Sequence, residues 1–166
     1  MRLLIILLVF ITIIFALSII YFNGYNKLSI IKAKMDSAND IISKSLKDKQ
    51  KLMNELYSQI KKVIKKKDYL KDFNSLNNKK LTNYELDIEL NNNLKIMKEL
   101  KEDNKELNTN EYNEILTKIE AKDEILIANK KYYNKNNNLL SKTINGYLKI
   151  IAKINHIKIQ TSYELK

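Results

Sequence analysis

The chain has 166 residues without proline, cysteine or tryptophan and with only two glycines, Gly24 and Gly146, so its composition disfavours a many-stranded sheet and favours long helices. The lack of cysteine excludes disulfide frameworks, thiolate metal sites, thiol nucleophiles and a lipid-modified bacterial N-terminus. The net charge of +11 comes from 30 basic and 19 acidic residues, but every basic residue except Arg2 is a lysine, and nucleic-acid readers rely on bidentate arginine, so no specific nucleic-acid partner is expected.

The first predicted element is a membrane anchor. Residues 3–22 read LLIILLVFITIIFALSIIYF, without a charge and with only Thr12 and Ser18 as mild polar interruptions. A helix of about 20 residues, rising about 1.5 Å per residue, crosses the roughly 30 Å hydrocarbon layer of a bilayer. We therefore expect a single transmembrane helix in residues 1–24, with membrane lipid as its partner, followed by an interfacial aromatic belt that includes Tyr21 and Tyr25.

A cleavable signal peptide is the alternative for this segment, because Ala16-Leu17-Ser18 offers small residues to a signal peptidase. The apolar run, however, continues to Phe22, and Arg2 is its only preceding charge, which favours an uncleaved anchor. Basic residues within reach of the span are more numerous on its C-terminal side, namely Lys27, Lys32 and Lys34. The positive-inside rule therefore predicts a single-pass protein of the cell membrane with its body on the cytoplasmic side.

After Gly24 the hydrophobic pattern changes from continuous to periodic. Residues at steps of three or four form one apolar stripe in which Lys49 is the only polar member, and this predicts a long amphipathic helix continuous with the anchor. The stripe consists of Leu28, Ile31, Met35, Ala38, Ile42, Leu46, Lys49, Met53, Leu56, Ile60 and Ile64. A short extra turn is expected around Tyr69, Leu70, Phe73 and Leu76, before a break at Asn77-Asn78.

A second helix is predicted to start at Thr82, which has the capping-box spacing to Glu85, and to end around Leu107. Its loose stripe consists of Tyr84, Ile88, Leu94, Met97 and Leu100. Residues 108–110 then connect to a third helix with Glu111 in its first turn.

The third helix is expected to be long, weakened by the run 136–138 and by Gly146, and followed from Ile154 by an extended packing arm. Its stripe consists of Tyr112, Ile115, Ile119, Leu126, Tyr133, Leu140, Ile144, Leu148 and Ile151.

Helices joined by short loops bury their stripes by running antiparallel. The predicted fold class is therefore all-α: an N-terminal transmembrane helix in residues 1–24, followed in residues 25–166 by an elongated up-down-up antiparallel bundle of three or four long helices.

Several stretches of the body match a known family in order and spacing. They are Tyr25-Asn26-Lys27-Leu28 after the span, then residues 37–42, 46–57 and 123–134, and Tyr163-Glu164 near the end. In these stretches the chain resembles the LemA family of bacterial membrane proteins. It is similar to a divergent member, with Asn39 in place of a tryptophan, Asp48-Lys49 in place of two arginines and Asn54 in place of a proline. The resemblance implies a helical-bundle domain, without an active site to transfer.

No residue set in the sequence predicts catalysis, a cofactor or a metal. His156 is the only histidine and is interpreted as structural or solvated, and two separated glycines cannot make a phosphate loop. The acidic clusters are interpreted as solvated faces with lysine partners, the basic run as a solvated helix end, and one of Tyr132 and Tyr133 as core. The clusters are Glu102, Asp103 and Glu106, and Glu120, Asp123 and Glu124; the basic run is Lys61, Lys62, Lys65, Lys66 and Lys67.

Two functions remain, neither of them enzymatic. The first is a membrane-anchored helical scaffold or interaction module that binds a protein partner or a second copy. The alternative is a basic surface-binding protein attracted to anionic polymers such as cell wall or nucleic acid. Salt dependence separates the two, because counterion-driven binding weakens as salt rises.

Overall fold

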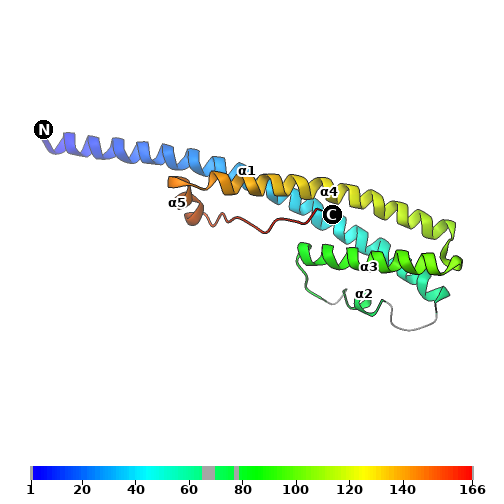
Figure 1. Cartoon of the computed structure of the whole chain (residues 1–166). Coiled ribbons are helices and arrows are strands. Elements are labelled where there is room, and N and C mark those ends of the chain that lie inside the picture. The colour runs from blue at the N-terminus through cyan, green and yellow to red at the C-terminus, as the bar shows by residue number, and fades with distance from the viewer. Residues whose placement is uncertain (1, 65–69, 77–78, 166) are drawn as a thin grey trace. The chain divides into compact units, whose positions relative to one another are not determined.

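The computed structural model describes residues 2–64, 70–76 and 79–165, and the regular elements in these ranges are all helices (Figure 1). The all-helical prediction is confirmed. In chain order the elements are α1 (Arg2–Val63), α2 (Lys71–Leu76), α3 (Asn83–Asp103), the 3₁₀ helix η1 (Lys105–Leu107), α4 (Asn110–Thr143) and α5 (Gly146–Ile154).

The chain divides into two compact units. Unit 1 consists of Met1–Ala38 and Tyr132–Glu164, and unit 2 consists of Asn39–Lys131 and Leu165–Lys166. Unit 1 contains the first part of α1, the end of α4, all of α5 and the tail. Unit 2 contains the remainder of α1, all of α2, α3 and η1, and most of α4. The boundary predicted after residue 24 stays a prediction.

The stripe predicted for the first long helix is confirmed. Its members from Leu28 to Ile60 are buried, Lys49 included, and Ile64 at its end is half-buried. Gly24 does not interrupt α1, which continues through it as one helix of 62 residues. A Cβ at Gly24 would lie 2.6 Å from a side-chain carbon of Ile151 and 2.8 Å from one of Leu148, so this glycine permits a close approach of α5 to α1.

The start of α3 is the predicted capping box. The backbone amide of Glu85 donates to the Thr82 hydroxyl, and the Thr82 amide donates to the Glu85 carboxylate at 2.8 Å. That backbone hydrogen bond lowers the pKa of Glu85. The predicted end near Leu107 is corrected: α3 stops at Asp103 because Asn104 adopts extended backbone angles, and a separate 3₁₀ turn follows. Tyr69 and the predicted break at Asn77-Asn78 lie outside the described residues.

The predicted third helix is divided in two. The α4 helix ends at Thr143, and α5 begins at Gly146 with a φ of +47°, a conformation that costs glycine little. The run 136–138 does not weaken α4, which is the opposite of our expectation. Asn137 is buried and holds the tail, because its side chain donates to the Gln160 carbonyl at 2.6 Å and accepts from the Gln160 amide at 3.0 Å.

The predicted packing arm is present in part: it begins after Ile154, which belongs to α5, and Ile157 is buried whereas Ile159 is 52% exposed. Asn134 repeats this pairing with the backbone of Tyr163, at 2.7 and 2.8 Å, and the Tyr163 ring packs edge-on against Tyr133. The arm starts where α5 ends. His156 has a φ of 53°, and the amides of His156 and Ile157 donate to the carbonyls of Lys153 and Ala152, which is the Schellman pattern of a helix C-terminus.

The directions of the helices in unit 2 differ from the predicted up-down-up order. Asn39 of α1 contacts Asn83 of α3, and Lys49 contacts Asn91, so α3 runs parallel to α1. The pairs Lys98–Glu120 and Lys130–Asp87 make α4 antiparallel to α3. The expectation was wrong because it assumed a short connection after α1, whereas α1 ends at Val63 and α3 begins only at Asn83. Part of this connection packs on α1, where Phe73 of α2 meets Tyr57 edge-on with the ring centroids 5.7 Å apart.

Replacing Ile42 by Asp tests the buried face of α1. Ile42 is fully buried, so an unpaired carboxylate there should lower the free energy of unfolding by several kcal/mol. Ile41 is 43% exposed and is a matched control, because the same replacement there should change stability by no more than about 0.5 kcal/mol. Urea denaturation followed by circular dichroism measures both. Equal losses in the two variants would contradict the packing described for α1.

Candidate functional site

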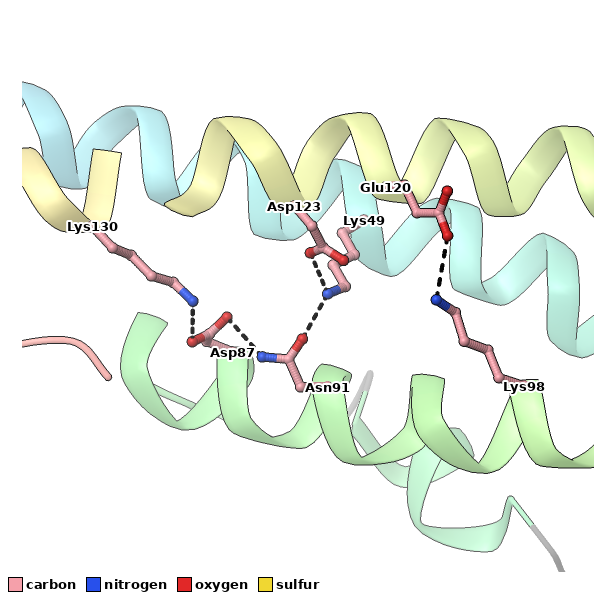
Figure 2. Close-up of polar contacts among 7 residues, drawn as sticks. All are labelled: Lys49, Asp87, Asn91, Lys98, Glu120, Asp123 and Lys130. Carbon is pink, nitrogen blue, oxygen red and sulfur yellow. Dashed lines mark hydrogen bonds and ion pairs between the residues drawn. The ribbon is translucent and has the colours of Figure 1, made fainter. Parts of the chain in front are cut away.

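The interior of unit 2 contains a charged group that needs partners. Lys49 lies on the apolar stripe of α1 with its side chain fully buried. Its ammonium group donates to the carboxylate of Asp123 on α4 at 2.5 Å and to the side-chain carbonyl of Asn91 on α3 at 2.7 Å. One lysine thereby joins three helices, as Figure 2 shows.

A second ion pair extends this arrangement. Lys130 of α4 donates to Asp87 of α3 at 2.5 Å, and both side chains are only 7% exposed. The Asn91 amide donates to the other oxygen of Asp87 at 3.3 Å, so Asn91 links the two pairs. Lys49, Asp87, Asn91, Asp123 and Lys130 are called the polar layer below, and their dashed contacts form one chain in Figure 2.

The charges of the polar layer balance, because two lysines face two aspartates. Burial lowers the pKa of Lys49, and the hydrogen bond and charge of Asp123 act in the opposite direction. Among the described side chains, every buried nitrogen or oxygen atom has a hydrogen-bond partner. A buried pair gains little net free energy because desolvation offsets the attraction, so we expect its main effect to be the selection of one register of the helices.

Two open grooves lie along α3. One, with a volume of about 460 Å³, is lined by Lys98, Lys101, Glu102, Lys105, Asn108, Leu116 and Glu120. The other, of about 440 Å³, is lined by Asn91, Leu94, Lys95, Lys98, Glu99 and Glu102. Neither Lys49 nor Lys130 is among the residues that line these two grooves. The grooves carry charges of both signs, and Lys98 pairs across the first with Glu120 at 3.4 Å.

The first part of α1 is the other notable surface. Its large apolar side chains between Leu3 and Phe22 are exposed by 47% to 83%. Its two hydroxyl groups are satisfied within the helix, since Thr12 donates to the Val9 carbonyl at 2.7 Å and Ser18 to the Ile14 carbonyl at 2.8 Å. By length and composition this helix can cross a membrane, and it is the only one in the described ranges that passes this test.

The sequence candidates fall in different places. Asp123 was interpreted as part of a solvated face, and this is corrected: it pairs with buried Lys49. Glu124 and His156 are exposed, as are Lys61 and Lys62 at the end of α1, whereas Lys65–67 lie outside the described residues. Tyr133 is buried and Tyr132 is 45% exposed, so the expectation that one of the two is core is confirmed. No cluster of three or more potential metal ligands occurs among the residues that the structure describes.

Sequence reasoning missed Asp87, Asn91 and Lys130. The available signal was Lys49 itself, since a lysine in an apolar stripe requires an acidic partner on a facing helix. The predicted stripe of α3 included Tyr84 and Ile88, but both are half-buried, and α3 buries Asp87 and Leu90 on its packed face instead.

The comparisons with known proteins add no relative. No family model, no curated protein and no solved structure matches the chain. The resemblance to the LemA family therefore stays a prediction.

Breaking and then removing the buried pair tests the role of the polar layer. Lys130→Met should lower the free energy of unfolding by about 3–5 kcal/mol, because it leaves Asp87 charged and unpaired in the interior. The double variant Lys130→Met with Asp87→Leu should recover most of that loss, because two apolar side chains need no desolvated charges. Urea denaturation of the single and double variants measures both effects.

The matched control is Lys122→Met. Lys122 also pairs across two helices, with Asp48 at 2.9 Å, but both side chains are about one-third exposed. Its loss should cost no more than about 1 kcal/mol. A double variant as unstable as Lys130→Met alone would show that the pair itself stabilises the fold, and would contradict a role confined to register.

Proposed function

We propose that this chain is a single-pass, membrane-anchored helical scaffold or protein-interaction module without catalytic activity. Residues 3–22 of α1 form the anchor in lipid, and α1, α3 and α4 form a helical-bundle body on the cytoplasmic side. The protein is a divergent relative of the LemA family in this proposal. Its partner is another protein or a second copy.

The observation that carries the anchor is the uniform exposure of apolar side chains on α1 from Leu3 to Phe22. Water exposure of so many large apolar groups is unfavourable, at roughly 25 cal/mol per Å², whereas the lipid interior accepts them. The internal hydrogen bonds of Thr12 and Ser18 support the same assignment, because a polar group in lipid needs a partner within the protein. Tyr21 and Tyr25 stack at 6.4 Å where an interfacial aromatic belt is expected.

The non-catalytic assignment is supported by the pairing and the limited accessibility of the buried lysines in unit 2. The two buried lysines are already paired with carboxylates, and neither lines the grooves along α3. An amine that acts as a base or nucleophile needs access to a substrate, as well as a lowered pKa. The polar layer is therefore better suited to holding helices in register than to chemistry.

The alternative function is binding to anionic polymers, which the net charge of +11 favours. Its expected signature is affinity that falls steeply as salt rises. Partner binding through apolar helix faces would keep most of its affinity under the same conditions.

The anchor is tested by placing charge in its centre. Full-length protein should remain in the membrane pellet through alkaline carbonate washing. Arginine at both Ile11 and Ile14 should release it, because each charge at the centre of a span costs about 2.5–3.5 kcal/mol. The control variant has arginine at Ile30 and Ile41, which are also exposed isoleucines of α1 but lie beyond the span. This control protein should stay in the membrane pellet. Extraction of the wild-type protein, or a mature N-terminus at Ile19, would contradict the anchor.

Sidedness is tested with an introduced cysteine, because the natural chain has none. Asn108 lies exposed between η1 and α4, so Asn108→Cys should react readily with a maleimide. With Lys27, Lys32 and Lys34 holding the C-terminal flank inside, a membrane-impermeant maleimide should label it only after the cells are opened. Leu107→Cys is the buried neighbouring control and should label only after denaturation. Labelling of Asn108→Cys in intact cells would reverse the topology.

A further inference from the structure

The α5 helix exposes an apolar face that the described residues of unit 1 leave uncovered. Tyr147, Ile150 and Ile154 are 55%, 64% and 60% exposed, and their spacing of three and four residues puts them on one side of the helix. Leu148, Ile151 and Ala152 are buried on a different side. The helix therefore has two apolar sectors, of which only one is used within the protein.

The charges of α5 occupy the remaining sector. Lys149 and Lys153 are both exposed and lie four residues apart, so they share a face next to the exposed apolar one. No acidic residue occurs anywhere in α5. A helix with an apolar face flanked by lysines and no acids has the pattern of a helix that lies in the interface of an anionic bilayer.

The position of α5 connects this face to the anchor. Its buried side packs directly on Gly24, two residues after the end of the apolar span, with Leu148 and Ile151 at the closest distances. The hydroxyl of Tyr21 and the amide of Asn155 at the end of α5 are joined by a hydrogen bond of 3.0 Å. Figure 1 shows α5 beside α1 at the point where the unaccompanied N-terminal stretch of α1 ends.

We propose that α5 is an interfacial helix whose exposed face, made of Tyr147, Ile150 and Ile154, inserts into the headgroup region of the same membrane that the anchor crosses. Lys149 and Lys153 then reach anionic headgroups, while their aliphatic stems cover apolar surface. Gly24 and Tyr21 hold α5 against the end of the span. The exposed face of α5 therefore lies at the depth of the lipid headgroups, where the apolar interior of the membrane meets water. The inference rests on the proposed anchoring of residues 3–22.

A single introduced tryptophan tests this, because the natural chain has none. Full-length Ile150→Trp is reconstituted in phosphatidylcholine–phosphatidylglycerol vesicles that contain a lipid with a nitroxide near its headgroup. Its fluorescence should be quenched several-fold more strongly than that of Ile41→Trp. Ile41 is also an exposed isoleucine of α1, but it lies 19 residues beyond Phe22, about 28 Å further along the helix.

Phe15→Trp, in the middle of the span, reports on the anchor separately. It should be quenched most by a nitroxide near the ends of the acyl chains. Quenching of Phe15→Trp, with Ile150→Trp quenched no more than Ile41→Trp, would overturn the interfacial helix and leave the anchor intact. Failure of Phe15→Trp to be quenched would overturn both.

A second copy is the competing occupant of this face. In that case, the emission of Ile150→Trp would shift to the blue as the protein-to-lipid ratio rises, without quenching by the headgroup nitroxide, and the proposal would be overturned. Ile154→Trp probes the same face one turn further along and should behave like Ile150→Trp. Circular dichroism of each variant establishes that its helices are intact.

Discussion

The structure of unit 2 depends on the burial of one charge. Lys49 lies on the packed face of α1 with no exposure to solvent, and an isolated ammonium group there would be strongly unfavourable. Its two acceptors come from α3 and α4, so they are in reach only when all three helices are correctly placed along their axes. Apolar stripes alone do not impose this, because Leu, Ile and Met side chains pack acceptably in more than one register and in either direction. The polar layer adds the directional contacts that the apolar core lacks. The contact of Lys49 with Asn91 can form because α1 and α3 run parallel in this alignment.

Unit 1 is organised by a different kind of contact. Gly24 lets α5 approach α1 more closely than any side chain would allow, and the asparagines at 134 and 137 hold the tail through its backbone amides and carbonyls. Both ends of α5 use a left-handed residue, Gly146 at the start and His156 after the end. The only histidine of the chain therefore has a structural role in its backbone, since histidine tolerates this conformation better than bulky or β-branched residues do. Its side chain is left exposed.

Periodicity predicted the part of the fold that depends on the hydrophobic effect. The stripe of α1, the capping box at Thr82, the start of α4 and the packing arm all follow from local patterns, and the structure contains each of them. Three features needed information that a local pattern does not carry. The direction of α3 depends on contacts with α1 that are distant in the sequence, such as Lys49 with Asn91. The separation of α4 from α5 goes with a positive φ at Gly146, which glycine permits but does not require. The polar layer depends on pairing Lys49 with residues 42 and 74 positions away. Asp87 and Lys130 resemble surface residues until the facing helix is known.

The two units should therefore differ in what perturbs them. In unit 2 the sensitive property is charge, because removing one member of a buried ion pair leaves the other member without an opposite charge. In unit 1 the sensitive property is volume, because any Cβ at Gly24 meets the side chains of Ile151 and Leu148 at distances that require them to move. The exposed face of α5 is sensitive to neither, since Ile150 and Ile154 are not packed against the described part of the chain. Large apolar groups on the surface, next to a helix that can span a membrane, are most simply explained by an interaction with a membrane or with another protein.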